Sequence, residues 1–101
     1  MYGLQSNEID AINNVFAKYI KVEKVLLFGS RAKGTQNPVS DIDITIIGKN
    51  ITHKDLSEIT SDLNDLLLPY EIDISIFDEI DNIALKERIL QSDVVFYEKR
   101  L

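Results

Sequence analysis

Three aspartates stand at spacings that could bring their carboxylates together. Asp41 and Asp43 lie two residues apart in a stretch of alternating polarity, and Asp73 lies in a second stretch with almost the same alternation. Residues two apart on a β-strand leave the same face of the sheet, with Cα atoms about 6.5 Å apart. If the two stretches are neighbouring strands, the three carboxylates share a small space and repel one another unless a cation is present.

Carboxylates without histidine or cysteine partners are typical ligands of hard cations such as Mg²⁺ or Mn²⁺. Two such ions about 4 Å apart can clamp the attacking and leaving oxygens of a displacement at phosphorus. The pattern therefore predicts a metal site built from Asp41, Asp43 and Asp73, with two Mg²⁺ ions expected and Mn²⁺ as an alternative. The competing interpretation is an ordinary solvent-facing strand, since one Asp-x-Asp pair is a weak signal.

A segment with phosphate-binding chemistry precedes the aspartates. An apolar run ends at Phe28 and is followed by Gly29, Ser30, Arg31 and, two residues on, Lys33. Backbone N–H groups and a hydroxyl at such a turn donate to phosphate oxygens, and glycine lets the backbone come close. The arginine and the lysine add positive charge. We predict that these four residues bind a nucleotide. The alternative is a plain turn with solubilising basic residues, which is what a lone Gly-Ser usually is. The spacing is not that of a P-loop.

The surrounding pattern predicts the elements that must hold these residues. Apolar spacing indicates helices over residues 6–20, with Ser6 as N-cap, over 52–67, with Thr52 and Asp55 as a capping pair, and over 80–89. Apolar runs and alternation indicate strands over residues 25–28, 41–47, 71–77 and 94–97. This order predicts an α/β (α+β) fold with a small mixed β-sheet of about four strands and helices packed on one face. The aspartates then project from the other face, which no further element is predicted to cover.

Length and composition limit the alternatives. The 101 residues are expected to form one domain, 1–101, and no apolar run approaches the roughly 18 residues of a membrane span. The absence of cysteine fits a reducing compartment, so a cytoplasmic location is expected. A net charge of −6 argues against non-specific nucleic-acid binding but allows a nucleotide held through a metal.

Taken together, the segment from Phe28 to Gly34 and the segment from Ser40 to Ile44 closely resemble the signature of the DNA polymerase β-like nucleotidyltransferase superfamily. In particular, the chain resembles the minimal nucleotidyltransferases, over about residues 24–97. The resemblance implies the nucleotidyltransferase fold. It also implies that Gly29 and Ser30 bind phosphate, that Asp41 and Asp43 bind metal, and that Asp73 completes a metal site and helps to activate the acceptor hydroxyl. Many members of that family have arginine where this chain has Lys33.

The resemblance also implies an activity and a partner. It implies a Mg²⁺-dependent enzyme that moves a nucleoside monophosphate, AMP from ATP, to a hydroxyl. In the minimal nucleotidyltransferase (MNT) antitoxins, the acceptor is a tyrosine of a helical HEPN-type toxin. One alternative is a nucleotide-binding or toxin-neutralising subunit with little catalysis by itself. A further alternative is transfer to a small molecule such as an aminoglycoside, although the substrate-binding extension of those enzymes is lacking.

Overall fold

The computed structural model describes residues 1–92 and 94–99. Its elements follow in the order α1 (Ser6–Ala17), β1 (Val22–Phe28), α2 (Ser30–Lys33), β2 (Ile42–Gly48), α3 (His53–Asn64), β3 (Ile72–Ile76), the 3₁₀ helix η1 (Phe77–Glu79), α4 (Ile83–Ser92) and β4 (Val95–Glu98). Within these residues, no helix has both the length and the apolar character that a membrane crossing needs. The predicted class, a small mixed sheet with helices, is confirmed.

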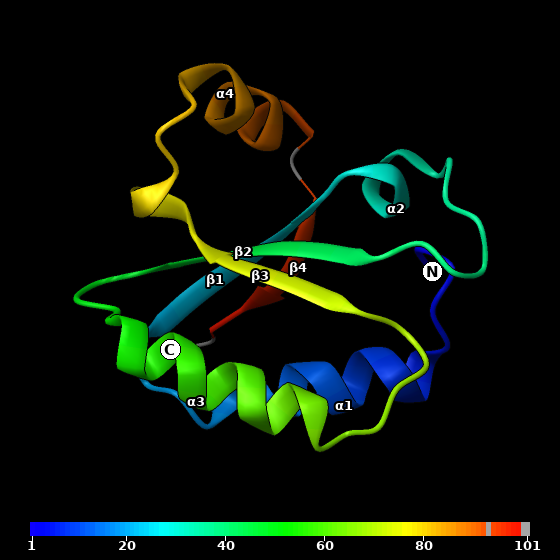
Figure 1. The fold of residues 1–101 in the computed structure, drawn as a ribbon, viewed down its shortest axis with the longest axis horizontal. Helices are drawn as coiled ribbons and strands as arrows, with labels where there is room; N and C mark the ends of the chain where they lie inside the picture. Colours follow the sequence, from blue (N-terminus) through cyan, green and yellow to red (C-terminus); the bar gives the residue numbers. More distant parts are fainter. Residues whose placement is uncertain (93, 100–101) are drawn as a thin grey trace.

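The sheet has the strand order β3-β2-β1-β4 (Figure 1). Strand β1 runs antiparallel to both β2 and β4, whereas β2 and β3 run parallel. A parallel connection needs a crossover, and α3 supplies it between β2 and β3. The two stretches of alternating polarity are therefore adjacent strands.

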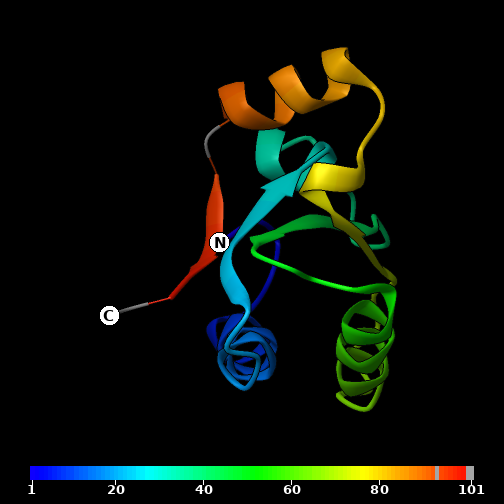
Figure 2. The same ribbon diagram turned by 90° about the vertical axis from the view of Figure 1, so that its left-hand side faces the viewer.

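Helices α1 and α3 lie together against one face of the sheet (Figures 1 and 2). Three isoleucines of β2, Ile42, Ile44 and Ile46, are fully buried in the resulting core. Helix α1 contributes Ile12 and Phe16, which are also fully buried. The isoleucines of β2 thus point into the core, so the residues between them lie on the opposite face of the sheet.

Helix α4 lies on the opposite side of the sheet from α1 and α3 (Figure 2). Leu26 of β1 and Ile89 of α4 are buried, yet neither belongs to the core cluster formed with α1 and α3. The expectation that the helices cover one face therefore holds for α1 and α3 and fails for α4. The reason is topological: β3 and β4 lie at opposite edges of the sheet, and the chain between them crosses the face that bears the aspartates.

The element boundaries follow local hydrogen bonding. The predicted capping pair of α3 is confirmed, because Asp55 N–H donates to Thr52 Oγ1 at 3.2 Å and Thr52 N–H donates to Asp55 Oδ2 at 2.9 Å. The N-cap of α1 is Gln5 and not the predicted Ser6. The Gln5 N–H donates to the carboxylate of Glu8 at 2.9 Å, which satisfies the helix start one residue earlier.

Candidate active site

The turn after β1 and a carboxylate of β2 occupy the same small space. Gly29 has φ of +77° and ψ of −156°, a positive-φ conformation that glycine adopts without steric cost. A Cβ placed on this residue would lie only 2.5 Å from Oδ2 of Asp43. Glycine is therefore required here for two reasons, and its lack of a side chain lets the Asp43 carboxylate approach the Gly29–Ser30 turn.

Strand pairing brings a second carboxylate beside the first. Asp43 and Asp73 are register partners in the parallel β2–β3 pair, and Phe28 is the partner of Asp43 on β1. Neighbouring strands are about 4.8 Å apart, so both aspartates leave the same face side by side. Asp41 lies just before β2 and is exposed. The prediction that the two strands bearing the aspartates are neighbours is confirmed.

The electrostatics of the group centre on Asp43. Partial burial raises the pKa of its carboxyl, and the negative charges of Asp73 and Asp41 raise it further. Like charges at this distance disfavour ionisation of the middle carboxyl unless a cation is nearby. The charges of Asp73 and Asp41 therefore both act on the Asp43 carboxyl.

Among the described residues, no three acidic, histidine or cysteine side chains are arranged to enclose a metal ion. The structure thus has a carboxylate pair with Asp41 beside it, and not the three-carboxylate cluster that the sequence predicts. This arrangement still fits Mg²⁺, which is held through one or two carboxylates with substrate phosphates completing its coordination. The placement of Asp43 and Asp73 as register partners on neighbouring strands is the observation that favours a cation here. Asp43 and Asp73, with Asp41, are the residues that would hold it.

Behind the carboxylates, Thr45 and Ser75 occupy the next register position on the same face. Thr45 is fully buried, and its hydroxyl donates to the carbonyl oxygen of Ser75 at 3.3 Å. The Ser75 hydroxyl donates in turn to Thr45 Oγ1 at 3.1 Å. These bonds join β2 to β3 directly below the carboxylates and so help to fix their separation.

Arg31 does not have the predicted role. Its side chain is only 2% exposed, and its guanidinium donates to backbone carbonyls instead of facing the turn. Nε and Nη2 donate to the carbonyl oxygen of Ser40 at 3.1 and 2.7 Å, and Nη1 donates to that of Tyr2 at 3.0 Å. The prediction that Arg31 binds phosphate is therefore wrong, because its side chain is buried and three of its five N–H donors are already used inside the protein.

The contacts of Arg31 nevertheless join the segments that carry the site. Its carbonyl acceptor Ser40 immediately precedes Asp41, and its guanidinium lies 4.7 Å from the ring centroid of Tyr70, three residues before Asp73. Arg31 itself belongs to α2, directly after the turn. A single buried cation thus links the turn with the segments leading into β2 and β3. Arg31 is a positioning residue.

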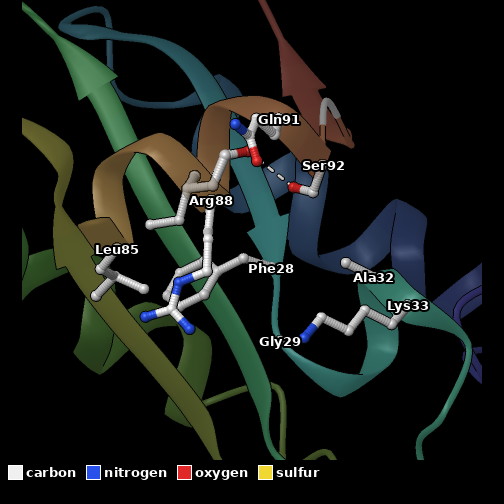
Figure 3. A pocket seen from close by; sticks show the side chains of 9 residues that line it. Phe28, Gly29, Ala32, Lys33, Leu85, Arg88, Gln91 and Ser92 are labelled. Atoms are coloured by element: carbon white, nitrogen blue, oxygen red, sulfur yellow. Dashed lines mark hydrogen bonds between the residues drawn. The ribbon is translucent and has the colours of Figure 1, made fainter. Parts of the chain in front are cut away.

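Of the remaining residues predicted to bind nucleotide, Ser30 is partly exposed and Lys33 is exposed. No hydrogen bond joins the hydroxyl of Ser30 to the described residues, and Lys33 makes no ion pair with them. Figure 3 shows the amine of Lys33 directed toward Gly29. Both are thus available to a ligand at the turn, and their phosphate contacts stay a prediction.

A pocket of about 420 Å³ opens beside the turn, between α2 and α4 (Figure 3). Phe28, Gly29 and Lys33 line one side, and Leu85 and Arg88 of α4 line the other. Sequence reasoning missed the residues of α4, because their spacing carries no motif. Only the strand order could have indicated them. Because β4 pairs with β1, the helix that precedes β4 must pass close to the turn at the end of β1.

The comparisons with known proteins agree with this geometry. Residues 10–100 match the family described as polymerase β, nucleotidyltransferase. No curated protein matches the chain. A solved toxin–antitoxin structure with AMP-PNP is similar over 96% of this chain and 76% of its own, with TM-score 0.72 and 22% identity. A mutant of the toxin–antitoxin MntA–HpeT is similar over 96% and 75%, with TM-score 0.68 and 17% identity.

At these identities the two solved structures establish a shared fold and no more. The family match carries more weight, because it spans nearly the whole chain and includes the turn at Gly29 and the aspartates of β2 and β3. The chain therefore belongs to the polymerase β nucleotidyltransferase family.

Proposed function

We propose that this chain transfers AMP from ATP to a hydroxyl of a partner protein, a tyrosine of a helical HEPN-type toxin, and so acts as an antitoxin in the cytoplasm. The observation that carries the proposal is the contact between the Gly29 turn and the Asp43 carboxylate, with Asp73 beside it. Phosphate-binding groups next to paired carboxylates suit transfer at phosphorus. The solved structures named as toxin–antitoxin complexes, one with AMP-PNP, support the choice of nucleotide and partner.

In the proposed reaction, the acceptor oxygen attacks the α-phosphorus of ATP and the bond from that phosphorus to the β-phosphate bridging oxygen breaks, releasing pyrophosphate. Asp73, at the exposed edge of the carboxylate pair, accepts the proton of the hydroxyl. Asp41 and Asp43, together with Asp73, would hold Mg²⁺, which would supply positive charge to the phosphate oxygens and make the acceptor hydroxyl more acidic. Ser30 donates its hydroxyl to a phosphate oxygen. These groups act by positioning and electrostatics, as is usual for transfer at phosphorus.

The alternative is a subunit that binds nucleotide or neutralises a toxin with little turnover. Tight binding of a metal nucleotide needs the turn and a metal ligand, but it has no chemical need for a proton acceptor. Asp73 lies directly beside Asp43 and is exposed to an incoming acceptor. This placement favours the enzyme.

The test is transfer of label from α-labelled ATP in the presence of Mg²⁺ and the protein encoded beside this one. We expect label on the partner with the wild type and loss of transfer with Asp43→Asn. Asp10→Asn is a matched control, since Asp10 is an exposed carboxylate of α1, on the other side of the sheet. Mass measurement of both proteins identifies the group added.

Equal labelling by the wild type and Asp43→Asn would contradict the assigned mechanism. Nucleotide binding without any transfer to the partner would favour the binding subunit. Labelling of a small alcohol or an aminoglycoside, with the partner unlabelled, would move the acceptor to the small-molecule alternative.

A further inference from the structure

The pocket between α2 and α4 adjoins the proposed site but lies outside the residues assigned to it. It has a volume of about 420 Å³, and Phe28, Leu85 and Ile89 are apolar residues of its lining. It begins at Gly29, so it is continuous with the turn that contacts the Asp43 carboxylate. A ligand bound at the turn therefore has an open path in this direction.

Two cations from distant parts of the chain meet at this pocket. Lys33 ends α2, whereas Arg88 lies in α4, and both side chains are exposed. Neither forms an ion pair with the described residues, although the chain carries a net charge of −6. Figure 3 shows the Lys33 amine directed toward Gly29 and the Arg88 guanidinium reaching into the pocket near Phe28. Unpaired cations that converge on one pocket favour an anionic ligand.

The strand order says which part of a nucleotide would reach these cations. Asp73, Asp43 and Phe28 are register partners on β3, β2 and β1, and Phe28, the last residue of this row, also lines the pocket. If the reacting phosphorus lies at the carboxylates and the turn binds the next phosphate, the end of the phosphate chain lies at Lys33 and Arg88.

We infer that Arg88, together with Lys33, binds the terminal phosphates of the nucleoside triphosphate and the pyrophosphate formed from them. This inference rests on the proposed function. A guanidinium offers paired donors that match phosphate oxygens, whereas lysine is a point charge. Arg88 thereby supplies, from α4, the paired donors that Lys33 lacks. Both residues touch the ligand in this arrangement.

The test is calorimetric titration of the full chain, with Mg²⁺ present, using ATP, inorganic tripolyphosphate and AMP as separate ligands. We compare the wild type with Arg88→Gln and Arg88→Lys. Glutamine keeps the helix propensity of an exposed position, and unchanged thermal melting verifies the fold. The matched control is Lys86→Gln, because Lys86 is a cation of the same helix whose amine lies over the Phe77 ring, 5.0 Å from its centroid.

We expect Arg88→Gln to raise the Kd of ATP and of tripolyphosphate by about 10-fold to 100-fold, the usual effect of losing a charged hydrogen bond. Arg88→Lys should lie between Arg88→Gln and the wild type. AMP binding and the Lys86→Gln control should not change.

Weaker ATP binding with unchanged tripolyphosphate binding would overturn the inference, because the pocket would then hold the nucleoside. Unchanged ATP binding by Arg88→Gln would also overturn it, while wild-type transfer to the partner would leave the proposed function intact. Failure of the wild type to bind ATP or tripolyphosphate at all would contradict both the proposed function and the inference.

Discussion

The buried guanidinium of Arg31 gives the sharpest prediction from the structure. Arg31→Met keeps an apolar stem of similar length but removes three N–H donors, which bind the carbonyls of Ser40 and Tyr2, and the contact with the Tyr70 ring. Hydrogen bonds from a charged donor contribute about 1.5–3 kcal/mol each, but burial of the charge offsets part of this. We expect the free energy of unfolding to fall by about 2–4 kcal/mol.

The loss should be measurable without unfolding the protein. A domain of this size has about 5–15 kcal/mol of stability, so Arg31→Met should stay folded at 25 °C. The midpoint of urea unfolding should fall by about 1–3 M. Because Ser40 precedes Asp41, we also expect kcat of transfer to fall about 100-fold, as it does when a catalytic group is displaced by about 1 Å. The Kd of Mg²⁺-ATP should change little.

A phosphate-binding Arg31 would give the opposite pattern. In that case the urea midpoint of Arg31→Met would equal that of the wild type, and the Kd of ATP would rise. Arg31→Lys separates the two roles further, since lysine keeps the charge but cannot reach both carbonyls. Tyr70→Phe is the matched control for the ring contact, because it keeps the ring under the guanidinium, whereas Tyr70→Leu removes it.

Two further predictions use the turn and the start of α3. Gly29→Ala and Gly34→Ala both place a side chain at positive φ, +77° and +76°. Gly34 is in the left-handed helical conformation, so Gly34→Ala should lose about 1–2 kcal/mol in urea unfolding. Gly29→Ala should lose more, because its Cβ would also meet the Asp43 carboxylate. Only Gly29→Ala places a Cβ against Asp43, so only this variant should also lose transfer; equal loss by both would refute the contact. The backbone N–H of Thr52 and, after it, the amine of Lys21 donate hydrogen bonds that lower the pKa of Asp55 from 3.8 to about 2. The ionised Asp55 carboxylate therefore contributes fully to the free energy of unfolding above pH 3.8, and this contribution is lost as the pH falls toward 2. In urea unfolding between about pH 4 and pH 2, the free energy of unfolding of Asp55→Asn should depend less on pH than that of the wild type.

The main elements of the site could be predicted because they depend on local pattern. Alternating isoleucines in β2 fix which face the aspartates occupy, and the same alternation in β3 makes it a partner for β2. A glycine after a buried strand indicates a turn whatever lies around it. These features need only the period of a strand and the conformational freedom of glycine, both of which are readable from the residues themselves.

Arg31 could not be assigned correctly on that basis, because its surroundings come from three distant segments. An arginine beside a glycine–serine turn is expected to face solvent or a ligand, since charged side chains are rarely buried. Here the carbonyls of Tyr2 and Ser40 and the ring of Tyr70 together replace water around the guanidinium. No residue pattern within α2 predicts that Arg31 contacts these residues.

The same reasoning explains why α4 changes the interpretation of the site. From the sequence, the face that bears the aspartates has no cover, so a ligand would be held at the turn alone. The position of β4 next to β1 brings α4 over this face, and with it Arg88. The strand order alone thus places a second wall beside the proposed ligand site. If Arg88 binds the leaving pyrophosphate, residues of this wall should affect product release as well as nucleotide binding, and the order of substrate addition should be sensitive to α4.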